Sequence, residues 1–136
     1  MYKIIQNILI QLKRIFRPYN ADVIVDFIFV KGLFFISIKN PGNKPAYRVS
    51  INFNDKIFGL EGTKEISELP LFKNIEFLAP QKEIKTFLDT SSSYFKRENP
   101  IQVVANITYH DGNGIEYNKI IKHDLGIYKE IGYIAT

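Results

Sequence analysis

Apolar residues recur at helical spacing at the start of the chain and at alternating positions after it. Between residues 2 and 17 they fall three, four or one positions apart, and Gln, Asn, Lys and Arg take most of the other positions. This period predicts an amphipathic helix. Pro18 disfavours helical geometry at Arg17 and ends the helix there. From Asp22 onward the period changes to two, which is typical of half-buried β-strands.

The clearest early strand pair joins residues 22–30 to residues 33–39 through a two-residue turn at Lys31-Gly32. This turn sets Phe29 opposite Phe34 and gives the hairpin one wholly apolar face. The other face is also largely apolar, with Ile24, Ile28, Val30, Leu33 and Phe35 interrupted by Asp26 and Ser37. A solvated sheet face is more polar. We therefore expect the N-terminal helix, the C-terminal tail or another molecule to cover part of it.

Further strands are expected after the turn at residues 40–43 and over residues 83–89, whereas residues 71–79 fit either a strand or a helix. The last hairpin joins residues 101–110 to 115–121. Matching their alternation predicts Tyr109 opposite Ile115, Ile107 opposite Tyr117 and Val103 opposite Ile121. After Leu125, apolar residues at helical spacing predict a short helical tail packed on the domain.

About seven short strands without strand–helix alternation predict an all-β fold, namely an immunoglobulin-like antiparallel β-sandwich. The expected parts are a basic amphipathic helix over residues 1–19, the β-sandwich domain over 20–125 and the C-terminal tail over 126–136. The chain has no cysteine and no tryptophan. An antibody-type domain, a disulfide framework and a thiolate metal site are thereby excluded.

Three sequence stretches resemble landmarks of the bacterial and archaeal CARDB-type modules. In FFISIKNPGNKPAYRVSINF a strand ends in Asn-x-Gly and an alternating strand returns; LAPQKEIKTFLD has a Leu-x-Pro turn before a strand; ITYHDGNGIEY is similar to their final hairpin. The resemblance spans about residues 22–123. It implies a non-catalytic sandwich used for adhesion or as a spacer.

The positive charge of the chain belongs to its N-terminal segment. The chain has 18 basic and 14 acidic residues and a net charge of +4. Residues 1–19 hold four bases and no acid, so residues 20–136 hold fourteen of each and sum to zero. A nucleic-acid-binding domain usually spreads Lys and Arg over one face of its folded body. Nucleic acid is therefore not an expected partner.

A basic amphipathic helix of this kind is typical of attachment to a membrane interface or a partner groove. It is too short and too often interrupted by Gln and Asn to span a bilayer, and it lacks the cleavage site of a secretory signal. Packing on its own domain, or pairing with a second copy, are alternatives that stay open. The residues expected to make the contact are Lys3, Ile4, Ile5, Ile8, Leu9, Leu12, Lys13, Arg14, Phe16 and Arg17.

Sequence patterns that would indicate a metal site or an enzymatic activity are weak. His110 and His123 each precede an aspartate, but both fall on or beside strands and about nine strand residues apart, too far to share a metal ion. Asp111-x-Asn113 fits a hairpin turn better than a calcium loop. No phosphate-binding loop or nucleophile–base pair occurs. We expect no cofactor, no metal and no enzymatic activity, and identify no small-molecule substrate.

A second candidate contact lies in the polar stretch that starts at Ser91 and runs to Pro100, which we interpret as an exposed loop. Its candidate residues are Tyr94, Phe95, Lys96 and Arg97. Most other aromatic residues stand at alternating positions suited to the core, which argues against a carbohydrate-binding face. The expected partners are a protein or a second copy of the chain, and an anionic membrane surface. The expected location is the cytoplasm, at the inner face of the membrane.

Overall fold

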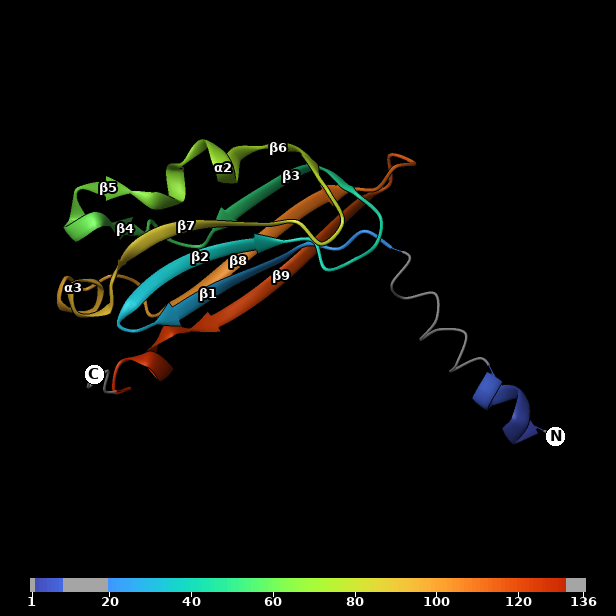
Figure 1. Ribbon diagram of the computed structural model, residues 1–136, viewed down its shortest axis with the longest axis horizontal. Helices are drawn as coiled ribbons and strands as arrows, with labels where there is room; N and C mark the ends of the chain where they lie inside the picture. The colour runs from blue at the N-terminus through green and yellow to red at the C-terminus, as the bar shows by residue number, and fades with distance from the viewer. Residues whose placement is uncertain (1, 9–19, 132–136) are drawn as a thin grey trace.

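The computed structural model describes residues 2–8 and 20–131, and its body consists of two antiparallel sheets (Figure 1). One sheet has the order β1-β2-β7 and the other the order β6-β3-β8-β9. These strands are β1 (Ile24–Val30), β2 (Leu33–Lys39), β3 (Ala46–Phe53), β6 (Ile75–Leu78), β7 (Glu83–Thr90), β8 (Gln102–His110) and β9 (Glu116–Asp124). The predicted all-β fold with antiparallel sheets is confirmed.

The core lies between the two sheets because each strand turns its apolar alternate positions inward. Val25, Phe27, Phe34 and Ile36 from one sheet and Ile51 and Ile107 from the other are all buried. Phe34 lies at one end of this core, where its ring packs within 5.6 Å of the rings of Phe29, Tyr94, Phe95 and Tyr128. The two layers therefore bury one continuous apolar core.

The β1–β2 hairpin has the predicted register. Phe29 pairs with Phe34, Phe27 with Ile36 and Val25 with Ile38. Both turn residues have positive φ, 50° at Lys31 and 79° at Gly32. This is the type I′ geometry that matches the twist of adjoining strands, and glycine adopts it without strain.

The turn after β2 is held together by the buried side chain of Asn40. Its Nδ2 donates to the carbonyl oxygens of Lys44 at 2.8 Å and Leu78 at 3.2 Å, and its Oδ1 accepts from the amide of Gly42 at 2.9 Å. Gly42 is required here because a Cβ would lie 2.0 Å from the carbonyl oxygen of Asn20. One side chain thus joins the end of β2 to the end of β6 across the two sheets.

The β8–β9 hairpin shows that the predicted register is wrong by two residues. Tyr109 pairs with Tyr117 rather than Ile115, and Val103 pairs with His123 rather than Ile121. The cause is the turn. Asp111 Oδ1 accepts from the amides of Asn113 and Ile115 at 2.9 and 3.0 Å, which stabilises a longer loop than the sequence indicated. A shift of two residues leaves every side chain on the same face, so apolar alternation could not reveal it.

The segment between β3 and β6 contains the short strands β4 (Phe58–Gly59) and β5 (Lys64–Glu65) and the helical turns η2 (Leu60–Gly62), η3 (Ile66–Glu68) and α2 (Pro70–Lys73). Residues 71–79 are therefore partly helix and partly strand. Phe72 of α2 is fully buried, and its ring lies 5.1 Å from the ring of Phe53. This segment closes one side of the core.

Polar side chains close the side of the sandwich where β1 and β9 lie together. His123 Nε2 of β9 lies 2.9 Å from the carbonyl oxygen of Val25, and Lys119 Nζ lies 2.9 Å from Asp22 Oδ1. The amide of Phe27 donates to Asp26 Oδ1 at 2.8 Å. Because the contacts at the Val25 carbonyl and the Phe27 amide occupy backbone groups of the edge strand β1, they hinder its pairing with a strand of another molecule.

The two ends of the sandwich are formed by different elements. β1 starts at the end where β8 and β9 meet, and η4 (Leu125–Tyr128) lies at the opposite end (Figure 1). Leu125 is buried and the Tyr128 ring stacks 5.4 Å from the Phe29 ring, so the start of the predicted C-terminal tail packs on the domain as a short 3-10 turn. Residues 132–136 of that tail lie outside the described residues.

Candidate functional site

The first candidate contact surface is the N-terminal segment, of which the structure describes residues 2–8. These residues are helical and every one of them is exposed. Ile4, Ile5 and Ile8 expose 63, 52 and 53 % of their surface. Their spacing places them on one side of the helix. Exposed isoleucines on one helical face form the kind of apolar surface that binds a partner or a membrane interface.

The rest of the predicted contact residues in this segment, Leu9, Leu12, Lys13, Arg14, Phe16 and Arg17, lie outside the described residues. Lys3 is within them and is exposed. Of the helix predicted over residues 2–17, the structure describes residues 2–8, which are helical, and the helix as a whole stays a prediction. No helix in the described ranges is long and apolar enough to cross a membrane.

Several basic groups of the sandwich are paired with acids. Lys119 pairs with Asp22, Lys73 Nζ lies 2.6 Å from Glu68, and Arg97 pairs with the buried Asp89. All fourteen acids of the chain and fourteen of its eighteen bases lie between residues 20 and 131. The described body thus carries no net charge.

The second candidate surface, residues 91–100, does not have the predicted conformation. Ser91–Lys96 form the helix α3, started by the Thr90 hydroxyl, which accepts from the amide of Ser93 at 3.2 Å. Tyr94 is fully buried, and its hydroxyl donates to the carbonyl oxygen of Pro100. Burial also raises the pKa of Tyr94, so its hydroxyl remains protonated. Tyr94 is therefore a core residue, and its assignment to an exposed contact was wrong.

The other residues of this candidate divide between core and surface. The Phe95 ring packs 5.6 Å from the Phe34 ring and is partly buried. Arg97 pairs with Asp89, whose side chain is only 2 % exposed, and Asp89 Oδ1 also accepts from the amide of Thr90. Lys96 is exposed. Phe95 and Arg97 thus have structural partners, and Lys96 alone of the four projects fully into solvent.

Replacing Arg97 with alanine is expected to lower the free energy of unfolding by about 2 kcal/mol, because a buried carboxylate would lose its partner. This figure is below the usual cost of breaking a buried pair, since Arg97 is partly solvated. Lys96→Ala is the matched control, with an expected change below about 0.5 kcal/mol. Urea unfolding of both variants measures this, and equal losses would contradict the structural role given to Arg97.

The outer face of the β1-β2-β7 sheet is the third surface. Val30 and Leu33 are exposed, and Ile28, Phe35 and Phe87 are half-buried. The rings of Phe35 and Phe87 lie 5.6 Å apart. We expected the C-terminal tail, among others, to cover this face. In the structure Tyr128 of that tail instead packs against Phe29 and Phe34, which point toward the core.

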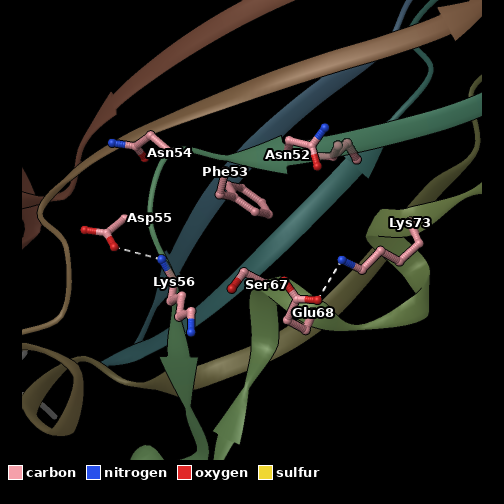
Figure 2. A pocket seen from close by; sticks show the side chains of 9 residues that line it. Asn52, Phe53, Asn54, Asp55, Lys56, Ser67, Glu68 and Lys73 are labelled. Atoms are coloured by element: carbon pink, nitrogen blue, oxygen red, sulfur yellow. Dashed lines mark hydrogen bonds and ion pairs between the residues drawn. The ribbon is translucent and has the colours of Figure 1, made fainter.

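A depression of about 260 Å³ lies between the end of β3 and the η3–α2 segment (Figure 2). Figure 2 shows Lys73 directed at Glu68 across its rim. Ser67 Oγ accepts from the amide of Ile57 at 3.0 Å, and Asn54 Oδ1 accepts from the amide of Val104 at 2.9 Å. These polar groups are already bonded within the fold and are not available to a ligand. Asn54 joins the end of β3 to β8, and Ser67 joins η3 to the residue before β4.

Four further ionisable side chains, Tyr109, Asp111, His110 and His123, have contacts within the fold. Burial, together with the nearby Asp22 carboxylate, raises the pKa of Tyr109 to about 12. Partial burial would raise the pKa of Asp111, but hydrogen bonds from the Ile115 amide, the Tyr117 hydroxyl and the Asn113 amide lower it below its usual range. Within residues 2–8 and 20–131, no three His, Asp or Glu side chains gather as metal ligands would. His110 and His123 pair instead with Glu116 and with the backbone of Val25.

Comparison with models of protein families shows which family the chain belongs to. Residues 8–129 match the model of the family described as Domain of unknown function (DUF8453). The chain belongs to this family. No curated protein matches the chain, and no solved structure matches it. The matched range begins within the predicted N-terminal helix, so the DUF8453 domain includes part of that segment as well as the whole sandwich.

Sequence reasoning missed one group of surface residues in the DUF8453 domain. Arg48, on β3, and Phe77, on β6, are exposed on the outer face of the four-stranded sheet, and the Phe77 ring lies 5.5 Å from that of Tyr47. Regular alternation would place Tyr47 on the same face as the buried Val49, but the pairing of β3 with β8 is irregular between Tyr47 and Ser50. Because of this register shift, Tyr47 and Arg48 do not follow the alternation of inward and outward side chains along the rest of β3.

Proposed function

We propose that this chain is a non-enzymatic interaction module of immunoglobulin-like topology, tethered by its basic amphipathic N-terminal helix to an anionic membrane surface. The observation that carries the proposal is the exposure of Ile4, Ile5 and Ile8 on one side of a helical segment that belongs to an acid-free, four-base leader. Residues 1–19 are called the leader below.

The strand order supports the immunoglobulin-like part of this proposal. In the constant-type immunoglobulin domain, the seven strands A to G divide into the sheets ABED and CFG. With the seven main strands lettered in chain order, this chain has the sheets ABE and CFG, and its fourth strand, β6, pairs with the third strand, β3. The difference is the transfer of one edge strand from one sheet to the other.

The resemblance to CARDB-type modules gains support from a contact between two of its landmarks. Asn40 and Gly42 belong to the Asn-x-Gly turn, and Leu78 belongs to the Leu-x-Pro turn. Asn40 Nδ2 donates to the Leu78 carbonyl oxygen, so the two turns lie together at one end of the sandwich. A non-catalytic sandwich that acts as an adhesion or spacer module is consistent with this arrangement.

The tether works through two additive contributions. Each base near an anionic leaflet contributes about 1 kcal/mol, and each buried CH₂ group of an isoleucine or leucine adds about 0.8 kcal/mol. The apolar side chains Ile4, Ile5, Ile8, Leu9, Leu12 and Phe16 would enter the interface, while Lys3, Lys13, Arg14 and Arg17 would meet lipid phosphates. The sum favours reversible attachment at the anionic inner face of a membrane, with the sandwich held in the cytoplasm.

Flotation of the full chain with vesicles tests the tether. Wild-type protein is expected to float with vesicles rich in phosphatidylserine and to remain in the dense fraction with phosphatidylcholine alone. Replacing Ile4, Ile5 and Ile8 with asparagine is expected to abolish flotation, because the apolar contribution disappears while all charges stay. The same three changes at Ile115, Ile120 and Ile127, which are exposed on the body, are the control. Equal flotation of the two triple variants would contradict the proposal.

A second candidate function is a structural subunit that self-associates. It is favoured by the outer face of β1, β2 and β7, where Val30 is 48 % exposed beside Leu33, Phe35 and Phe87. Association through this face, aided by the leader, would bury apolar side chains that face solvent in the monomer. Light scattering at micromolar concentration separates the candidates, since a monomer would exclude self-association and a dimer would support it.

A further inference from the structure

A second depression, of about 210 Å³, lies on the outer face of the four-stranded sheet, and the proposed function makes no use of it. It is lined by Tyr47, Arg48, Glu76, Asp111, Gly112 and Gly114. These residues come from β3, β6 and the loop between β8 and β9, three parts of the chain that the sheet brings together. This volume is below that of pockets that bind drug-sized molecules, so the depression suits a smaller ligand.

Arg48 reaches this depression from a strained backbone position. Its φ is 48°, in the left-handed region, and it lies where the pairing of β3 with β8 is irregular. A non-glycine residue there costs free energy that the surrounding strands must supply, and such bulges often re-aim a side chain at a functional surface. Arg48 is exposed, and its guanidinium forms no hydrogen bond or ion pair with any residue in the described ranges.

Two aromatic rings lie at this depression: Tyr47 lines it, and Phe77 is the cross-strand neighbour of Tyr47. Tyr47 and Phe77 are cross-strand partners, with ring centroids 5.5 Å apart and planes at 66°. Phe77 is 55 % exposed. A large apolar ring held at the surface by its neighbour presents a flat, weakly hydrated surface to a ligand. Gly112 of the hairpin loop lies over Tyr47, since a Cβ there would be 3.9 Å from the Tyr47 ring.

The acids around the depression have different roles. Asp111 uses both oxygens within its own hairpin: Oδ1 accepts two backbone amides and Oδ2 accepts the Tyr117 hydroxyl at 3.0 Å. Glu76 accepts from the Asn74 side chain through Oε1 only. The ligand would therefore meet a donor, Arg48, and an acceptor, Glu76. The lining thus carries charges of both signs, so neither a simple anion nor a simple cation is attracted by all of its charged groups.

We infer that this depression binds a neutral pyranoside. The ring carbons of a pyranose have an apolar face that can pack on Tyr47, which lines the depression, and on its exposed neighbour Phe77. Its adjacent hydroxyls both donate and accept, so they can bond Arg48 and Glu76 at once. A single sugar unit matches the size of the depression, and a neutral ligand is compatible with lining charges of both signs.

Chemical-shift titration of the full chain tests this inference. The probes are methyl α-D-glucopyranoside and methyl β-D-galactopyranoside, with sodium acetate as an anion probe, each up to about 50 mM so that a Kd in the millimolar range is measurable. At least one pyranoside is expected to shift the amide signals of Arg48, Phe77 and Gly112. Arg48→Gly and Phe77→Ala are each expected to weaken this binding at least about tenfold.

Arg48→Gly is the sharper variant because glycine accepts a positive φ, so the change removes the guanidinium without straining the fold. Lys31→Gly is its matched control: Lys31 is also an exposed cation with positive φ, 50°, on another strand connection, and its loss should leave binding unchanged. The inference is overturned if neither pyranoside shifts these signals, if acetate alone does, or if Arg48→Gly binds the sugar as well as wild type.

Discussion

Asn40→Ala is expected to lower the free energy of unfolding by about 3 kcal/mol, a large loss for a single polar side chain. Asn40 is fully buried and bonds four backbone groups, those of Asp22, Gly42, Lys44 and Leu78. Alanine would leave the buried Leu78 carbonyl and Gly42 amide without partners, and each such group costs about 1–3 kcal/mol. Urea or thermal unfolding measures the effect.

Asn52→Ala is the matched control for this prediction. Asn52 lies on β3 with an exposed side chain that bonds no described residue, so its loss should change stability by less than about 0.5 kcal/mol. If Asn40→Ala unfolds at the same urea concentration as Asn52→Ala, the two turns are not held together by this side chain, and the structural support for the CARDB resemblance is lost.

The strands that could be predicted are those in which turn chemistry and alternation agree. In the β1–β2 hairpin the two-residue Lys31-Gly32 turn allows one register, and that register puts Phe27 and Phe29 opposite Ile36 and Phe34. In the β8–β9 hairpin the loop contains two glycines and an aspartate, and registers two residues apart bury the same side chains. The capping by Asp111 decides between them, and it is a three-dimensional contact.

Helix α3 and the backbone conformation of Arg48 show two other limits of structure prediction from this sequence. Three serines in a row were interpreted as a loop, although Thr90 three residues before Ser93 is a capping signal that could have indicated the helix. Arg48 carried no such signal, because its backbone conformation depends on how β3 pairs with β8. Likewise, Asn40 was recognised as a turn residue, but its bond to Leu78 joins positions 38 residues apart.

The largest effect on binding is expected from removing the charges of the leader. Replacing Lys3, Lys13, Arg14 and Arg17 with glutamine keeps residues of high helix propensity but removes four cations. At about 1 kcal/mol for each cation near an anionic leaflet, the loss is about 4 kcal/mol, which corresponds to a several-hundredfold weaker partition onto the membrane. Added salt should also weaken wild-type binding, because salt screens the attraction between cations and an anionic membrane surface.

In the proposed function the surplus charge and the membrane contact both belong to the leader, while the sandwich is electrically balanced. The most direct test measures the partition of three full-length proteins onto vesicles rich in phosphatidylserine: wild type, the four-glutamine leader variant, and a body variant with the same net charge. The body variant carries Lys44→Gln, Lys64→Gln, Lys122→Gln and Lys129→Gln, four exposed lysines without an ion pair among the described residues. We expect a several-hundredfold loss for the leader variant and less than about a threefold loss for the body variant. Similar losses for both variants would show that net charge alone governs binding and would contradict the role proposed for the leader.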